Sequence, residues 1–463
     1  MIHISTSFAL LVVAIIILVC IAGSRLSGRL GVPTLFIFIM LGMLFGSDGI
    51  FKIPFGNFAL AEQVCSVALI FIMFYGGFGT RWSEAKPVAG RSILLSSAGV
   101  VLTALLTGLF CHLVLKMALM EGMLLGAVLG STDAASVFSI LRSRKLNLKY
   151  GTASMLELES GSNDPFAYMM TVILLSAMTG SVSGGSTVLL LIRQLAFGLL
   201  TGAVIAWLVT WLLKRYAFYG EGFDTIFVFA AAIISYALAS QIGGNGYLSV
   251  YLTGIILGNQ ELKNQKALVG FFDAFTGMMQ MLLFFLLGLL AFPSQMPSIV
   301  LPAIAIALFL TFVARPAAVG LLLAPSKPPI GQYLVISWAG LRGAASIVFA
   351  IMATLSEGYM KHDIFHIVFC VVLFSIIFQG SLLPKVAEKC DMIDNSSDVM
   401  RTFSDYTGDM QIQFVQLPIG DNHPWKNRKI CEIEMLPGML ITVIRRGAQT
   451  IVPKGQTVIL EGD

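Results

Sequence analysis

The chain has 463 residues, of which 57% are hydrophobic and 12% charged, and its formal net charge is +4. Its mean hydropathy is +0.87, which excludes an ordinary soluble globular protein. Long uncharged runs separated by short basic loops predict an all-α polytopic membrane protein.

The hydrophobic pattern predicts about 13 transmembrane helices. The stretch Met1 to Ala22 has no basic n-region and no small-residue cleavage site, so it is interpreted as the first span and not as a removable signal. The predicted spans cover residues 4–22, 33–48, 60–78, 92–114, 119–141, 152–178, 187–213, 224–242, 246–258, 268–291, 297–324, 332–355 and 363–384.

Basic residues in the connecting loops predict the orientation. The loops after odd-numbered spans hold most of the lysines and arginines, and the loops after even-numbered spans hold only Lys52, Lys116 and Lys361. By the positive-inside rule, the odd loops are cytoplasmic, the N-terminus lies outside and the C-terminus lies in the cytoplasm.

Two spans are interrupted at matching positions. The fifth contains GSTDAAS, residues 130–136, and the twelfth contains GLRGAAS, residues 340–346, so a shift of 210 positions aligns them. Seven spans separate the pair, which gives them opposite directions in the membrane. Paired interruptions of this kind indicate inverted repeats with two broken crossing helices near a transport site.

Each break predicts exposed helix ends. Asp133 and Arg342 carry the charges that would compensate the freed amides and carbonyls, and a freed carbonyl near Thr132 could also bind a cation beside Asp164. Asp133 could instead cap the second half-helix, as aspartate often does. The two interpretations of Asp133 are compatible.

The sixth span carries polar residues in an apolar helix. On one helix, Glu159 and Asn163 share a face, while Ser160 lies under Asp164. A hydroxyl, an amide and carboxylates close together form an oxygen cage that suits hard cations. The alternative is a buried polar helix whose acids are satisfied by arginines, but acids inside membranes usually mark ion pathways.

Arg315 lies deep in the eleventh span and needs an acidic partner. With Asp133 and Asp164 assigned to the site, we pair it with Glu159, which leaves Asp164 free to bind a proton.

The composition changes after Pro384. Residues 385–410 are polar and predict a linker, and residues 411–463 alternate in short runs separated by turn signals, as in a small soluble α+β unit. The unit ends at Glu461-Gly462-Asp463 without a closing strand, so we expect part of a cytosolic regulatory domain.

One carboxylate that binds either a cation or a proton couples the two by competition. Since Asn163 stands where a second carboxylate could stand, we expect one cation per proton and electroneutral exchange. A ligand-gated cation channel and an organic-solute symporter are the alternatives. The five histidines have no catalytic or metal spacing, so we predict no enzyme and no cofactor, and we expect no nucleic-acid partner.

The motifs ESGSNDPFA, GSTDAAS and WAGLRGAAS, in a chain of thirteen spans, resemble the monovalent cation:proton antiporter-1 family over residues 1–384. The resemblance implies a homodimer with a scaffold domain and a mobile core domain. It also implies that Asp164 is the shared cation and proton site, and that Glu159 and Arg315 form a structural ion pair. The residues expected to assist Asp164 are Thr132, Asp133, Ser160 and Asn163.

The tail, especially residues 443–447 and 451–463, resembles the C-terminal ligand-sensing domain of potassium transport regulators. This combination is similar to the bacterial potassium/proton antiporters. It implies an inner-membrane location, potassium as the cation with sodium as the alternative, and a small ligand or nucleotide on the tail.

Overall fold

The computed structural model describes most of the chain, in two compact units, Met1–Thr407 and Gly408–Asp463. The described residues are 6–30, 33–144, 146–180, 184–215, 221–262, 264–358, 360–394, 417–421, 423–433, 441–447 and 449–463.

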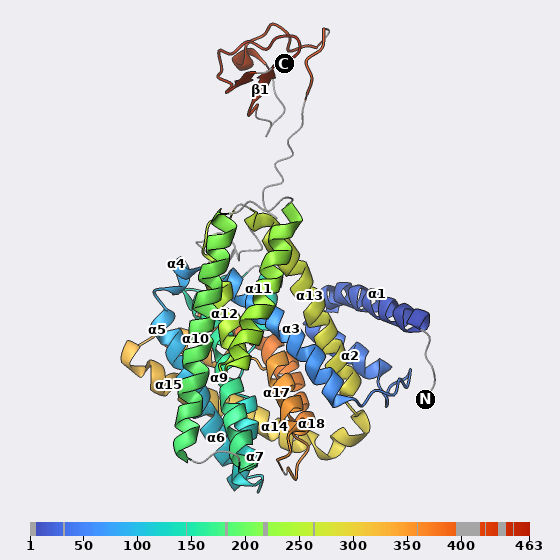
Figure 1. Cartoon of the computed structure of the whole chain (residues 1–463), viewed down its shortest axis with the longest axis vertical. Helices are drawn as coiled ribbons and strands as arrows, with labels where there is room; N and C mark the ends of the chain where they lie inside the picture. The colour runs from blue at the N-terminus through green and yellow to red at the C-terminus, as the bar shows by residue number, and fades with distance from the viewer. Residues whose placement is uncertain are drawn as a thin grey trace. The chain divides into compact units, whose positions relative to one another are not determined.

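The first unit is built of helices (Figure 1). They are α1 Thr6–Leu30, α2 Thr34–Phe45, α3 Phe58–Gly79, α4 Trp82–Ala85, α5 Ala89–Leu94, α6 Val100–Leu113, α7 Leu119–Val128, α8 Ala134–Ser143, α9 Thr152–Met178, α10 Gly184–Arg215, α11 Glu221–Gln241, α12 Gly246–Gly258, α13 Gln265–Leu290, α14 Val300–Phe309, α15 Arg315–Leu323, α16 Ile330–Trp338, α17 Ala344–Leu355, α18 Ile364–Phe374 and α19 Ser381–Lys389.

Three pairs of these helices are continuous through a π-helical turn, in which the backbone accommodates an extra residue. The turn Leu95–Gly99 joins α5 to α6, Leu310–Ala314 joins α14 to α15, and Ser375–Gly380 joins α18 to α19. Two short 3₁₀ segments, Pro293–Ser298 and Ala324–Ser326, flank the α14–α15 pair.

Among the described residues, seven helical segments are long and apolar enough to cross a membrane. They are Phe58–Gly79, Ala89–Leu113, Gly185–Arg215, Gly222–Gln241, Gln265–Leu290, Val300–Ser326 and Ile364–Lys389. Shorter apolar helices occupy other predicted spans, and the polar span predicted at 152–178 is α9. Each predicted span therefore overlaps a helix or a pair of helices, although α1 continues to Leu30, beyond the predicted end of the first span at residue 22.

The last helix is longer than predicted. Residues 385–389, expected to begin the linker, continue α19 to Lys389, because they are good helix formers and Ala387 packs fully buried in the core. Residues 395–410 of the predicted linker lie outside the described residues.

Small residues set the closest helix contacts. A methyl group on Gly254 of α12 would meet the Phe74 carbonyl of α3, and one on Gly202 of α10 would come within 2.6 Å of the Ser249 carbonyl oxygen of α12. Glycine at these places lets the backbones touch. The Gly198-x-x-x-Gly202 pattern therefore packs within the chain, against α12.

The described part of the second unit contains a small hairpin. Strands β1 Ile444–Arg446 and β2 Gln449–Ile451 pair antiparallel, with Ile444 opposite Ile451, and a 3₁₀ turn covers Ile430–Glu432. Four isoleucines form its core: Ile419, Ile433, Ile444 and Ile459. The described residues of this unit hold no α-helix, and the expected α+β unit stays a prediction. The predicted runs 411–417 and 439–445 lie wholly or partly outside the described ranges.

Candidate functional site

Two broken helices meet at the centre of the first unit. The interruption between α7 and α8 and the one between α16 and α17 remain 210 positions apart, since α8 begins at Ala134 and α17 at Ala344. The Asp133 amide donates a hydrogen bond of 2.8 Å to the Leu341 carbonyl oxygen. The backbone of one break is thus bonded directly to the other.

Charged side chains satisfy the helix ends that the breaks expose. The Asp133 carboxylate accepts from the backbone amide and hydroxyl of Ser136, at 3.2 and 2.5 Å, so it caps α8. The Arg342 guanidinium donates to the Ser131 carbonyl oxygen at 3.0 Å. The geometry therefore matches the charge compensation and the capping expected for Asp133.

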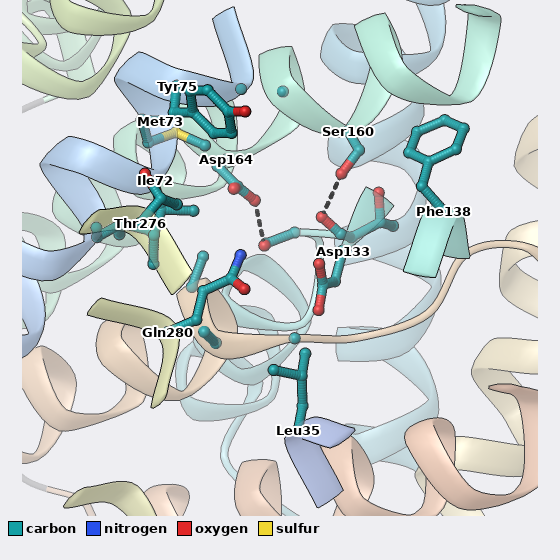
Figure 2. Close-up of a pocket in the computed structure, with 18 of the residues that line it drawn as sticks. Leu35, Ile72, Met73, Tyr75, Asp133, Phe138, Ser160, Asp164, Thr276 and Gln280 are labelled. Atoms are coloured by element: carbon teal, nitrogen blue, oxygen red, sulfur yellow. Dashed lines mark hydrogen bonds between the residues drawn. The ribbon is translucent and has the colours of Figure 1, made fainter. Parts of the chain in front are cut away.

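The predicted face of α9 lies against the first break. Asp164 is buried and accepts a short hydrogen bond from the Ser131 hydroxyl, drawn dashed in Figure 2. The Ser160 hydroxyl donates to the Thr132 carbonyl oxygen at 2.6 Å, and the Asn163 amide donates to the Thr132 hydroxyl at 2.5 Å. Because hydrocarbon cannot form hydrogen bonds with these polar groups, the break and α9 satisfy each other's donors and acceptors.

The expected ion pair is formed. The Arg315 Nη2 atom lies 2.6 Å from Glu159 Oε1, and both side chains are almost fully buried. Beyond this ion pair, neither Glu159 oxygen has a hydrogen-bond partner among the described residues. Glu159 is not among the residues that line the cavity described next.

A cavity of about 430 Å³ reaches the site. One wall is made by α9 and the broken helices, and the other by α3 and α13, as Figure 2 shows. The lining includes four carboxyl groups, on Asp133, Glu157, Asp164 and Asp273, and among its described residues none is lysine, arginine or histidine. Such a lining attracts cations and repels anions.

Several lining residues were missed from the sequence. Ser131 belongs to the GSTDAAS motif, and its hydroxyl donates a hydrogen bond to Asp164 that the sequence did not indicate. Glu157, Asp273 and Gln280 lie inside predicted spans and also line the cavity. Their signal was available, because Asp273 and Gln280 recur at helical spacing in an apolar stretch.

Aromatic rings pack one helical turn beyond Asp164. Tyr168 of α9 contacts Tyr247 of α12 and Phe349 of α17, with ring centroids 5.1 and 5.8 Å apart. Tyr236 of α11 stands 5.0 Å from Tyr247. Of the described α9 residues, the cavity touches Glu157, Ser160, Gly161 and Asp164 and none beyond them, so the cavity ends where this cluster begins.

Comparison with known proteins decides the family. The signature of the sodium/hydrogen exchanger transmembrane family matches residues 14–389. The chain belongs to this family. The resemblance expected from the three motifs is thereby confirmed, and the family consists of transporters and not of enzymes.

Curated relatives include named antiporters of this exchanger family. The K(+)/H(+) antiporter NhaP of Alkalimonas amylolytica is 37% identical over 382 residues, which cover 82% of this chain and 66% of that protein. The K(+)/H(+) antiporter NhaP2 of Shewanella sp. strain MR-4 is 33% identical over 460 residues, covering 98% of this chain and 79% of that protein. The chain thus spans between 66% and 79% of the length of these two relatives.

A solved exchanger shares the fold. The sodium proton antiporter MjNhaP1 from Methanocaldococcus jannaschii, at pH 8, superposes with a TM-score of 0.72 at 23% identity, over 83% of this chain and 99% of that one. The architecture expected from sequence, a helical polytopic membrane protein of the antiporter fold, is confirmed at this level.

Proposed function

We propose that the chain is a cation/proton antiporter that exchanges one potassium ion for one proton, with sodium as the alternative cation. Asp164 carries the proposal, because it is a buried carboxyl group at the end of a cavity lined by acids and, among its described residues, by no basic side chain. The names of the NhaP relatives favour potassium. A less similar relative, the Probable Na(+)/H(+) antiporter 2 of Methanocaldococcus jannaschii at 24% identity, favours sodium.

The coupling follows from competition at one carboxylate. A cation at Asp164 needs the ionised carboxylate, so its binding releases the proton, and protonation releases the cation. The Ser131 hydroxyl stabilises the ionised form by donating to it. Thr132 and Ser160 are the other oxygens that we assign to the bound cation, and Asn163 and Asp133 hold the break in place beside them.

The remaining charges stay constant during the cycle. Glu159 and Arg315 neutralise each other, and Arg342 faces the Ser131 carbonyl oxygen. The loaded and the protonated forms of Asp164 then have the same net charge, so exchange is electroneutral. The bare carboxylate has the largest desolvation cost and should cross poorly, which limits uncoupled leak.

We propose that all thirteen helical segments cross the bilayer, with the N-terminus outside and the C-terminus in the cytoplasm of a bacterial inner membrane. The exposed lining residues Gly76 and Asp273 lie near the helix ends that carry Arg81 and Lys266, so the cavity opens toward the cytoplasm by the positive-inside rule. The aromatic cluster beyond Asp164 closes the other side. In the proposed cycle, this state alternates with one in which Asp164 is open to the outside. We propose further that the protein is a homodimer and that its tail binds a small cytosolic ligand or nucleotide.

The test is proton movement in inside-out vesicles that contain the full chain. Adding potassium or sodium should release protons from the wild-type vesicles, and the Asp164→Asn variant should release none, because an amide cannot exchange a proton. Clamping the membrane potential at different values should leave the wild-type rate unchanged. No proton release by the folded wild type with either cation would refute antiport, and a potential-dependent rate would refute electroneutrality. Saturable, proton-linked flux also separates an antiporter from a ligand-gated channel.

A further inference from the structure

One face of α13 forms the cavity wall opposite Asp164. The lining residues of α13 are Asp273, Thr276, Gly277, Gln280 and Phe284. They recur every three or four positions and so lie on a single face of the helix. The Tyr75 hydroxyl of α3 donates to Asp273 at 3.0 Å, which fixes α13 against α3 at the exposed end of this face.

The α9 wall alone offers few free oxygens. Besides Asp164, the oxygens available there are the Ser160 hydroxyl, which donates its proton to the Thr132 carbonyl oxygen and keeps its lone pairs, and the Thr132 hydroxyl, which already accepts from the Asn163 amide. The Asn163 carbonyl oxygen faces the Thr132 backbone amide at 3.3 Å. A cation that sheds its water requires a shell of several oxygens, so Asp164 and its immediate neighbours leave that shell incomplete.

Gln280 is placed to add an oxygen from the other wall. Its side chain is half-buried and extends into the cavity toward the side that carries Asp164 and Asp133, as Figure 2 shows. In the part of the chain that the structure describes, the Gln280 amide makes no hydrogen bond. Its carbonyl oxygen is therefore available to a ligand without breaking an existing contact.

We propose that Gln280 is a specificity-determining residue, whose amide oxygen completes the cation shell and sets the preference between potassium and sodium. This inference rests on the proposed antiport at Asp164. A neutral amide oxygen has a weaker field than a carboxylate, and the number and field strength of such ligands bear on the choice between the two ions. Because α13 and α9 form opposite walls, the shell is complete only while both walls face the same cavity.

The experiment measures apparent KM for potassium and for sodium in proteoliposomes of the full chain. Gln280→Met removes the amide and keeps the chain length, so the potassium KM should rise about fivefold to tenfold, as expected for one lost polar contact. The sodium KM should change less, and the maximal rate should stay near that of the wild type. Gln280→Glu, with a stronger field, should shift the preference toward sodium.

Met278→Leu is the matched control, since Met278 is on the same helix, is 41% exposed and is absent from the cavity lining. Potassium-dependent protection against thermal unfolding of the purified variants gives a second readout that does not need transport. An unchanged potassium-to-sodium ratio in Gln280→Met, alongside wild-type exchange and an inactive Asp164→Asn, would overturn this inference alone. Absence of exchange in the folded wild type would overturn the proposed function itself.

Discussion

Glu159 and Arg315 carry opposite charges 2.6 Å apart, where neither side chain is more than 6% exposed. The pair adds little net stability relative to two apolar residues, because both charges lost their water on burial. Removing one of the two charges is costly, because the other charge stays buried without water or an opposite charge to stabilise it. We therefore interpret the pair as a structural ion pair that keeps its charges throughout the cycle.

This predicts a large cost for single substitutions. Glu159→Gln leaves Arg315 uncompensated and should destabilise the fold by about 3–5 kcal/mol, measured as thermal unfolding in detergent by tryptophan fluorescence. The double variant Glu159→Gln with Arg315→Gln removes both charges and should recover part of the loss. A double variant no more stable than the worse single variant would show that the charges are not coupled.

The pairing of Glu159 with Arg315 could be predicted from sequence because each stands in an apolar span and needs a partner. Glu157 and Asp273 also lie in spans, so the sequence alone offered Arg315 other acidic partners. Their place in the cavity depends on which face of α9 and α13 meets the other wall. That choice is made by tertiary packing and is not visible in either helix alone.

At the scale of elements, the broken helix α7–α8 depends on the Asp133 cap. Asn also caps helices well, whereas Ala does not. Asp133→Asn should therefore keep exchange within about threefold of the wild type. Asp133→Ala should destabilise the start of α8 by about 1 kcal/mol and reduce exchange further.

Proton release in vesicles, together with thermal unfolding of the purified variants, distinguishes the two roles of Asp133. Full loss of exchange in a normally folded Asp133→Asn would mean that the charge of Asp133, and not its cap, is needed.

The boundaries of two helices were predictable from the hydrophobic pattern, since the predicted spans 152–178 and 246–258 match α9 and α12. At the start of α12, the Asn245 side chain also caps the helix by accepting from the Leu248 amide at 3.0 Å. The three π-helical turns were not predictable, because an extra residue in a helix is stabilised by its neighbours in the fold. Two of them lie beside the site, at Arg315 and at Ser375, whose hydroxyl accepts from the Arg342 amide.

At the scale of the whole molecule, the cavity and the aromatic cluster predict one-sided access to Asp164. In a background with all six cysteines replaced by alanine, Ile72→Cys places a thiol in the cavity lining. A membrane-impermeant thiol reagent should label it much faster in inside-out vesicles than in right-side-out ones. Equal rates from both sides would contradict an inward-open resting state.

Leu189→Cys is a suitable control for that labelling, because Leu189 is 65% exposed on the surface of α10 and is absent from the cavity lining. The labelling rate of Leu189→Cys should not show the preference for inside-out vesicles that Ile72→Cys shows. The orientation of the loops stays a prediction from the sequence. The cavity could not be predicted, since a cavity exists only once helices from both halves of the chain are packed.

Asn163, whose amide donates to the Thr132 hydroxyl at 2.5 Å, cannot bind and release a proton as a carboxylate would, and this sets where the proposed exchange reaches equilibrium. With one titrating carboxylate, the proposed exchange stops when the transmembrane ratio of the cation equals that of protons, and voltage does no work on it. Each tenfold excess of cytoplasmic potassium would then drive the cytoplasm about one pH unit more acidic than the outside before balance. Continuous exchange of this kind would deplete the cytoplasm of potassium. We therefore expect the turnover of the proposed antiporter to be low except when the cytoplasm is alkaline or rich in potassium.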